Sequence, residues 1–157
     1  MIIDSHGNIL ESQAQAIVNT VNCVGVMGKG LALQFKRAYP QNFQAYVSAC
    51  KSGDVQLGSM FVYATNSLDG PQWIINFPTK DYWRNKSKLE YIRNGLQDLR
   101  AVIAELGISS IAIPPLGAGN GGLNWKDVHP VIVESLSDLA HVQIQVYFPL
   151  NDSPSGT

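Results

Sequence analysis

Apolar residues follow two patterns that alternate along this chain. Short runs rich in Ile and Val are typical of buried strands, and they predict strands over 1–4, 15–22, 59–65, 73–77, 109–114 and 142–148. Apolar residues that recur every three or four positions predict helices over 30–39, 40–51, 89–106 and 125–139. This alternation predicts an α/β fold of three layers, α/β/α, with helices on both faces of a mostly parallel sheet.

The helix predicted over 89–106 has the clearest boundaries. Gly107 ends its pattern, because glycine readily takes the left-handed conformation that closes a helix. Ser87 and Glu90 have the spacing of a capping box, which predicts that Ser87 caps the helix N-terminus. In the helix over 40–51, the spacing predicts an inward face formed by Phe43, Val47 and Cys50.

Two glycine-rich stretches each follow a predicted strand and lead into a predicted helix. They read NCVGVMGKGL over 22–31 and PPLGAGNGGLNW over 114–125. Glycine lets the backbone approach a ligand closely, and a loop of this kind before a helix presents free N–H groups to an anion. Neither stretch is a Walker A loop or a GxGxxG fingerprint, so kinase chemistry has little support. Either stretch by itself could also be a flexible connection.

Two polar residues at predicted strand ends are candidates for ligand binding or catalysis. Asn22 could shape a turn or donate a hydrogen bond to a ligand hydroxyl. Lys80 follows a buried strand, so it should project from the same sheet edge as the glycine stretches. A lysine whose pKa is lowered by burial and nearby cations can act as a nucleophile. Cys23 and the three histidines have no partner pattern and favour structural roles.

The segment that starts at Lys80 combines cations with aromatic rings. Five of the chain's 11 Lys and Arg residues lie within 14 positions, with three aromatic residues between them. The set comprises Lys80, Arg84, Lys86, Lys88 and Arg93 with Tyr82, Trp83 and Tyr91. Such a mixture suits the phosphates and stacked bases of single-stranded nucleic acid, although a solvated basic helix start is an equal alternative.

Composition narrows the class of protein. The 157 residues fit one domain over 1–150, followed by a polar tail or linker over 151–157. A formal charge of −1 argues against non-specific nucleic-acid binding over the whole surface. The two cysteines predict no disulfide framework, and no residue spacing predicts a metal site. Without a membrane span or a signal-peptide layout, the chain is expected to be cytoplasmic and monomeric.

Three stretches together resemble a macrodomain, the ADP-ribose-binding fold. They are AIVNTVNCVGVMGKGLALQFKRAYP, INFPTKDYWR and PPLGAGNGGLNW, and the resemblance extends from about residue 7 to 148. The combination is most similar to the macrodomains of DNA ADP-ribosyl glycohydrolase antitoxins, which are related to the terminal ADP-ribose protein glycohydrolase. The resemblance implies a mixed sheet between helices, with ADP-ribose as ligand or product and no cofactor.

The resemblance also assigns site residues. Asn22 and Lys80 would carry catalysis, while Asn8 and Ile9 would lie near the adenine. The distal ribose would lie against Val26, Met27, Gly28, Lys29, Gly30 and Leu31. Thr79 is a further ligand contact, and the diphosphate would lie against Gly117, Ala118, Gly119, Asn120, Gly121, Gly122 and Leu123. Candidates for DNA contact are Tyr82, Trp83, Arg84 and Lys86.

Three positions depart from relatives within this resemblance. Asn8 stands where many macrodomains have aspartate, and Ala118 stands where relatives often have cysteine. The protein-directed enzyme uses a loop aspartate that would fall at Gly121, and no acidic residue lies between Glu105 and Asp127. Its lysine–aspartate mechanism therefore does not carry over to this chain.

The resemblance implies a hydrolase that removes ADP-ribose from thymidine in single-stranded DNA. The implied partners are that modified DNA and a DNA ADP-ribosyltransferase toxin, contacted through a further C-terminal domain. Two alternatives remain open, a hydrolase of ADP-ribose on protein carboxylates and an ADP-ribose reader without turnover.

Overall fold

The computed structural model describes residues 1–150 as a six-stranded sheet covered by helices. The predicted tail over 151–157 lies outside the described residues. The strands are β1 (Ile2–Ser5), β2 (Ala16–Val21), β3 (Phe61–Ala64), β4 (Trp73–Pro78), β5 (Ser110–Ile113) and β6 (Gln143–Tyr147). Their order across the sheet is β1-β6-β5-β2-β4-β3. All neighbouring pairs are parallel except β3 and β4, so the sheet is mixed and mostly parallel, as predicted.

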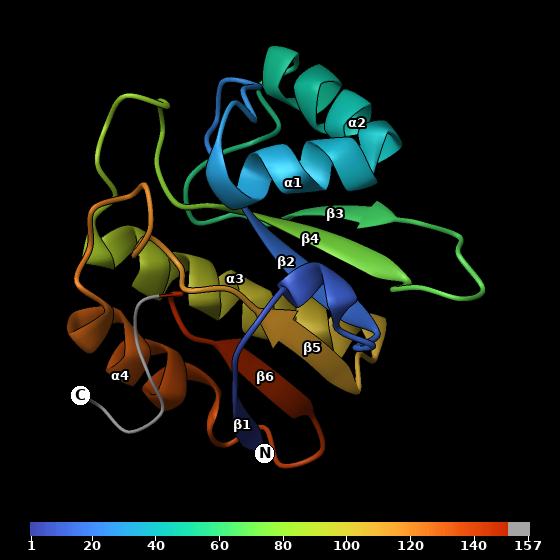
Figure 1. Cartoon of the computed structure of the whole chain (residues 1–157), viewed down its shortest axis with the longest axis vertical. Coiled ribbons are helices and arrows are strands. Elements are labelled where there is room, and N and C mark those ends of the chain that lie inside the picture. Colours follow the sequence, from blue (N-terminus) through green and yellow to red (C-terminus); the bar gives the residue numbers. More distant parts are fainter. Residues whose placement is uncertain (151–157) are drawn as a thin grey trace.

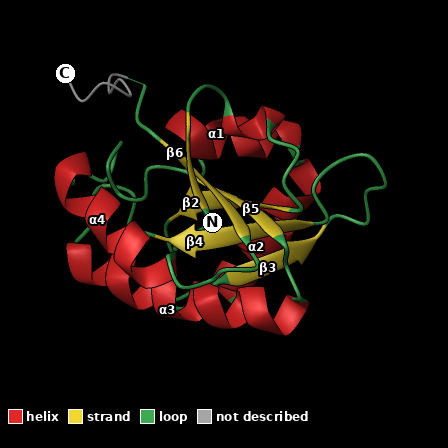
Figure 2. Ribbon diagram, turned by 90° about the horizontal axis from the view of Figure 1, so that it is seen from below, coloured by secondary structure: helices red, strands yellow, loops and turns green. Residues whose placement is uncertain are grey.

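Four α-helices and one short 3₁₀ helix connect the strands. They are η1 (Ile9–Glu11), α1 (Gly30–Ala38), α2 (Pro40–Lys51), α3 (Leu89–Leu106) and α4 (Trp125–Leu136). Helices α1 and α2 cover one face of the sheet, and α3 and α4 cover the other (Figures 1 and 2). This is the predicted three-layer arrangement. Within the described part of the chain, no helix has both the length and the apolar character needed to span a bilayer.

The order of the strands determines where a ligand can bind. Strands β6, β5, β2 and β4 are adjacent and parallel, so their carboxyl ends meet at one edge of the sheet. The two glycine-rich stretches follow β2 and β5, and the Lys80 segment follows β4. Segments far apart in sequence are thereby placed side by side at the edge where open α/β sheets bind ligands.

The predicted capping box at the start of α3 is wrong. The residue that caps α3 is Lys88, whose side chain makes no capping hydrogen bond. Ser87 is instead buried, and its hydroxyl donates to the Thr79 carbonyl while its N–H donates to the Gly121 carbonyl over 2.8 Å. A long-range polar contact therefore takes the place of the local cap.

The candidate ADP-ribose site

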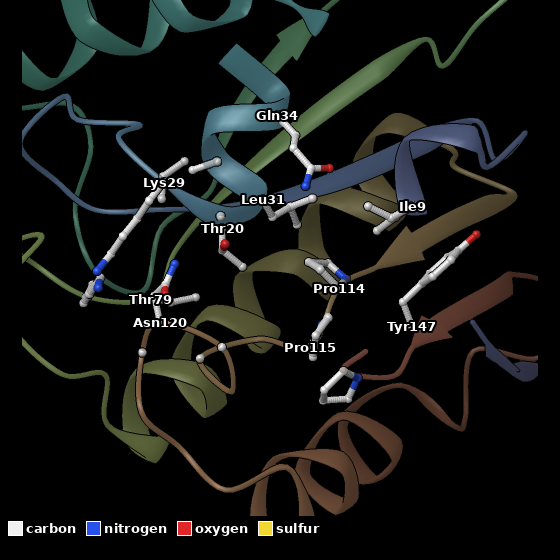
Figure 3. A pocket seen from close by; sticks show the side chains of 18 of the residues that line it. Ile9, Thr20, Lys29, Leu31, Gln34, Thr79, Pro114, Pro115, Asn120 and Tyr147 are labelled. Carbon is white, nitrogen blue, oxygen red and sulfur yellow. The ribbon is translucent and has the colours of Figure 1, made fainter. Parts of the chain in front are cut away.

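A cavity of about 960 Å³ opens at the shared strand edge. That volume is at the upper end of the range of small-molecule sites. Figure 3 shows side chains from several segments around one opening, among them Lys29 and Leu31 at the start of α1, Asn120 after β5 and Tyr147 at the end of β6. The two glycine-rich stretches and Lys80 therefore lie at the same edge of the sheet, as predicted, and line one cavity.

Asn22 organises the first glycine-rich stretch from inside. Its Oδ1 accepts the N–H groups of Val24 at 3.1 Å and Val26 at 3.4 Å, and its Nδ2 donates to the Val26 carbonyl at 2.9 Å. The buried Tyr46 hydroxyl lies 2.7 Å from Oδ1 and 2.9 Å from the Asn22 carbonyl oxygen. Asn22 can shape the turn and also contact a ligand. Its side-chain amide has two N–H groups, and only one of them is used in the hydrogen bond to Val26.

The second glycine-rich stretch is wound tightly on itself. Gly117 has φ +70°, which favours glycine, and the Leu123 N–H donates to its carbonyl over 2.9 Å. A Cβ placed on Gly121 would lie only 2.6 Å from the Gly117 carbonyl oxygen, a backbone atom that cannot move away easily. Any side chain at Gly121, a carboxylate included, is therefore excluded by the backbone of the same loop.

The two glycine-rich stretches approach each other across the cavity. Gly30 has φ +62°, and a Cβ there would lie 2.6 Å from Nδ2 of Asn120 in the opposite stretch. The absence of a side chain at Gly30 thus leaves room for Asn120. A ligand bound between the stretches would be held from two sides by backbone groups.

Lys80 lies half-buried at this cavity. Its Nζ donates to the Trp83 carbonyl over 3.1 Å. Burial, and secondarily the positive charge of Lys29, lower the pKa of Lys80 below its ordinary value. Both effects disfavour the ammonium form, so they increase the fraction of neutral amine at a given pH.

A hydrogen-bonded turn carries the aromatic and basic residues after Lys80. The Asp81 carboxylate accepts the Tyr82 N–H at 2.8 Å and the Asn85 amide at 2.9 Å, and these bonds lower the pKa of Asp81, with Asn85 the larger cause. The guanidinium carbon of Arg84 lies 4.7 Å from the centre of the Trp83 ring. Tyr82, Trp83, Arg84 and Lys86 are all exposed.

Most predicted ligand residues line the cavity. Those that do are Asn8, Ile9, Asn22, Val26, Gly28, Lys29, Gly30, Leu31, Thr79, Lys80, Gly117, Gly119, Asn120 and Gly121, together with Trp83 of the DNA candidates. Four predicted ligand residues are not part of the lining, namely Met27, Ala118, Gly122 and Leu123, and neither are the DNA candidates Tyr82, Arg84 and Lys86. Met27 is fully buried, and Ala118 and Leu123 pack against the main core.

The sequence did not predict a further group of residues that complete the lining of the cavity. They are Gly7, Thr20, Val21, Ala32, Gln34, Pro114, Pro115, Tyr147, Phe148, Pro149 and Leu150. Some could have been found, because Pro114 and Tyr147 stand at the carboxyl ends of adjacent parallel strands, and Gln34 lies one helical turn beyond Gly30. Within residues 1–150, no three potential metal ligands of the His, Cys, Asp and Glu types lie together.

The fold and the site define a class of protein. An open, mostly parallel sheet with two glycine-rich stretches around a cavity at its carboxyl edge is typical of α/β domains that bind phosphate-bearing ligands. The chain matches the Macro domain family over residues 18–132, which is most of its length. It therefore belongs to the macrodomain family.

Several named proteins are similar to this chain in sequence. It is 56% identical over 153 residues to the DNA ADP-ribosyl glycohydrolase of Mycobacterium tuberculosis, covering 98% of this chain and 44% of that protein. It is 34% identical over 159 residues to a DNA ADP-ribosyl transferase–DNA ADP-ribosyl glycohydrolase fusion protein of Thermosipho africanus, covering 92% and 41%. The chain thus spans less than half the length of these relatives.

Solved structures agree with this placement. The macrodomain of Mycobacterium tuberculosis DarG superposes with a TM-score of 0.94 at 57% identity, covering 95% of this chain and 98% of that one. The DarTG protein of Thermosipho africanus in complex with ADP-ribose superposes with a TM-score of 0.89 at 34% identity, covering 96% and 42%. The predicted fold and the predicted macrodomain relationship are both confirmed.

Proposed function

We propose that this chain is a DNA ADP-ribosyl glycohydrolase, which removes ADP-ribose from thymidine in single-stranded DNA. The observation that carries the proposal is the half-buried Lys80 amine at a cavity framed by two glycine-rich stretches. The names of relatives with 56% and 34% identity support the same activity. The reaction consumes one water molecule, whose hydroxyl ends on the anomeric carbon and whose proton goes to the base.

ADP-ribose itself would be both ligand and product. The stretch over 26–31 would hold the distal ribose, the stretch over 117–123 the diphosphate, and Asn8 and Ile9 the adenine end. The side chains of Met27, Ala118 and Leu123 face the core, so their contribution would come from the backbone. The ADP-ribose complex of the related Thermosipho africanus DarTG supports this choice of ligand.

Lys80 and Asn22 would carry the chemistry. Lys80 would act at the anomeric carbon, as a nucleophile when its amine is neutral or through its charge when protonated. The remaining N–H of Asn22 would donate to the reacting ribose and fix its orientation. Replacing Lys80 with Arg separates the two roles of the lysine, because arginine keeps the charge and cannot supply a neutral amine.

The DNA strand would run over the turn that follows Lys80. Its exposed cations, Arg84 and Lys86, suit phosphates, and its exposed rings, Tyr82 and Trp83, suit bases. These groups lie beside Lys80, so they would meet the modified thymidine and the nucleotides next to it.

The decisive experiment combines binding and turnover. Lys80→Ala should bind ADP-ribose in calorimetry nearly as well as the wild type, yet release no ADP-ribose from a modified oligonucleotide. Lys51→Ala, at the exposed end of α2, is the matched control and should behave as wild type. Full turnover by Lys80→Ala would contradict the role of Lys80.

The same assay separates the remaining readings. Wild-type protein that releases ADP-ribose from automodified protein and not from the oligonucleotide would be a protein-directed hydrolase. Binding without any product after long incubation would identify a reader.

We further propose a biological role for the domain. It would reverse the product of a DNA ADP-ribosyltransferase toxin in the cytoplasm, as the antitoxin of that toxin. The fusion of both activities in a relative supports this pairing. Direct contact with the toxin would belong to a further C-terminal domain, and the macrodomain itself would act as a monomer, which sedimentation analysis can test.

A further inference from the structure

Four exposed apolar residues gather beside Lys80. Val24, Val26, Tyr82 and Trp83 are 45%, 39%, 40% and 39% exposed. They account for four of the seven exposed large hydrophobic residues within the described range, the others being Met1, Leu68 and Leu150. We call these four residues the apolar rim, and such a gathering marks a binding surface more often than a chance exposure.

The two halves of the apolar rim come from different loops that are bonded together. The Cys23 N–H donates to the Asp81 carbonyl over 3.0 Å, and the Thr79 N–H donates to the Val21 carbonyl over 2.9 Å. These backbone bonds fix the loop after β2 against the loop after β4. The loop that carries the two valines is therefore held beside the loop that carries the two aromatic rings.

Side-chain hydrogen bonds keep the apolar rim exposed. Asn22 holds the backbone of Val24 and Val26 in its turn, and Asp81 holds the N–H of Tyr82. Moving these side chains into the core would break bonds to a buried amide or to a carboxylate. The rim is thus preorganised in the unliganded protein, which reduces the entropy lost when a ligand binds.

The apolar rim also lies where the reaction would take place. Val26 and Trp83 line the same cavity as Lys80, and the Trp83 carbonyl accepts the Lys80 amine over 3.1 Å. A group attached to an anomeric carbon at Lys80 would therefore leave the cavity across the rim.

We infer that the apolar rim is the subsite for the leaving group, and that it takes a flat pyrimidine base. Methyl groups and aromatic rings offer dispersion and stacking contacts to the faces of a base. A carboxylate side chain of a protein has no flat apolar face to match them. The Arg84 guanidinium, 4.7 Å from the centre of the Trp83 ring, places a cation for the adjoining phosphate. This inference rests on the proposed function and adds how the substrate is selected.

Substitution of Trp83 tests the subsite by selectivity. Because stacking on an aromatic side chain is worth about 1–3 kcal/mol per base, Trp83→Ala should lower kcat/KM on the ADP-ribosylated thymidine oligonucleotide by about five-fold or more. The loss should be much smaller on an ADP-ribosylated carboxylate ester. Leu68→Ala, at a residue 98% exposed in a loop remote from the cavity, is the control and should leave both rates unchanged.

A second measurement does not depend on turnover. Thymidine added to the ADP-ribose-loaded wild type should quench tryptophan fluorescence, and Trp83→Phe, which keeps Trp73 and Trp125, should abolish the quenching. Equal loss on both substrates, or quenching that survives in Trp83→Phe, would overturn the inference. If the wild type fails to act on the oligonucleotide, the proposed function fails, and the fluorescence measurement still decides whether a base binds at the rim.

Discussion

The amine of Lys80 is shaped by neighbours that sequence spacing alone does not reveal. Lys29 comes from the other loop, 51 positions earlier in the chain, and yet its charge acts on Lys80 across the cavity. The larger influence is burial at the sheet edge. The lowered pKa of Lys80 is thus a product of the fold.

Removing the charge of Lys29 should move the pH dependence of the reaction. In Lys29→Gln the pKa of Lys80 rises, because a like charge that disfavours the ammonium form has gone. If the neutral amine attacks, the rise of kcat with pH should shift to more alkaline pH. Burial remains and is the larger cause, so the shift should be partial.

The measurement is kcat at saturating substrate, since Lys29 also lines the cavity and its loss will weaken binding. Lys36→Gln is the control, because Lys36 lies over the Phe43 ring and not at the cavity. A profile that stays in place, or moves to more acid pH, would contradict a neutral Lys80 nucleophile.

Between elements, Ser87 links the end of β4 to the loop after β5. Its hydroxyl satisfies the Thr79 carbonyl next to Lys80, and its N–H holds Gly121. Ser87→Ala leaves the Thr79 carbonyl without this partner, which should lower the free energy of unfolding by about 1–3 kcal/mol. We also expect kcat to fall more than ADP-ribose affinity, because the loosened residue adjoins Lys80.

Chemical denaturation and calorimetry on Ser87→Ala check both effects. The exposed Ser48 on α2 provides the control, for which Ser48→Ala should change stability by less than about 0.5 kcal/mol. An equal fall in affinity and kcat would assign Ser87 a purely structural role.

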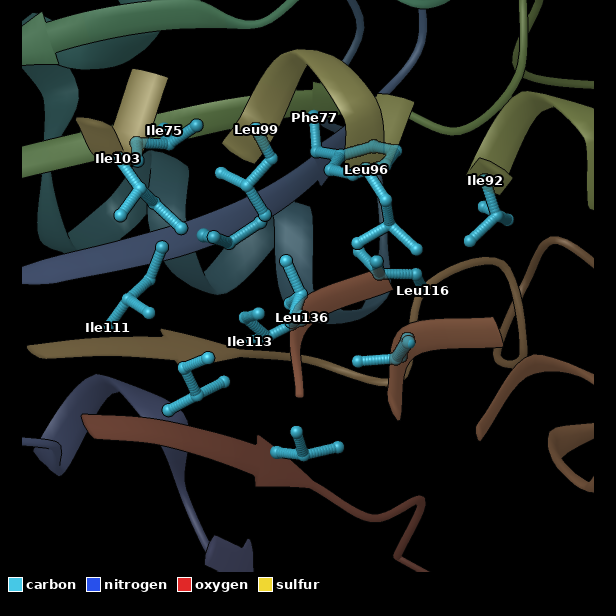
Figure 4. Packing of buried hydrophobic residues seen from close by; sticks show 14 of the residues in the cluster. Ile75, Phe77, Ile92, Leu96, Leu99, Ile103, Ile111, Ile113, Leu116 and Leu136 are labelled. Carbon is cyan, nitrogen blue, oxygen red and sulfur yellow. The ribbon is translucent and has the colours of Figure 1, made fainter. Parts of the chain in front are cut away.

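The contact of α3 with β4 depends on one glycine. A Cβ on Gly95 would lie 2.3 Å from the ring of Phe77, which is fully buried (Figure 4). Alanine would gain about 1 kcal/mol in helix propensity, but overpacking typically costs about 1–3 kcal/mol. Gly95→Ala should therefore destabilise the protein, as thermal unfolding will report.

A double mutant identifies the cause of this loss. In Gly95→Ala with Phe77→Leu, the smaller side chain makes room for the new methyl group, so the two effects should be less than additive. Additive losses would mean that the ring of Phe77 is not what excludes a side chain at Gly95.

At the scale of the whole molecule, we propose that residues 1–150 form the complete folding unit. A chain that ends at Leu150 should keep the melting temperature and ADP-ribose affinity of the full chain. A chain that ends at Tyr147 should lose both in part, because Phe148 lines the cavity and packs 5.3 Å from the rings of Trp125 and His129. Equal behaviour of the two truncations would contradict this boundary.

Local patterns predicted every strand and the long helix, because burial there follows a regular period. They failed where polar residues are buried. On α2 the fully buried positions include Asn42 and Tyr46, whereas the predicted face of Phe43, Val47 and Cys50 is only half-buried. Asn42 exchanges amide hydrogen bonds with Asn76, 34 positions away.

The same limit applies to the site. The two glycine-rich stretches and Lys80 were visible as motifs at strand ends. The bond from the Ser87 N–H to Gly121 and the bond from Tyr46 to Asn22 instead join segments distant in sequence. No pattern in the chain indicates them before the fold is known.

The winding of the second glycine-rich stretch has a consequence for how such enzymes change. Every glycine codon can become an aspartate or a glutamate codon by a single base change. The Gly117 carbonyl, 2.6 Å from where the new Cβ would stand, makes that one-step route unproductive. A lysine–aspartate pair that uses position 121 therefore requires a change in the backbone conformation of this loop as well as the substitution itself.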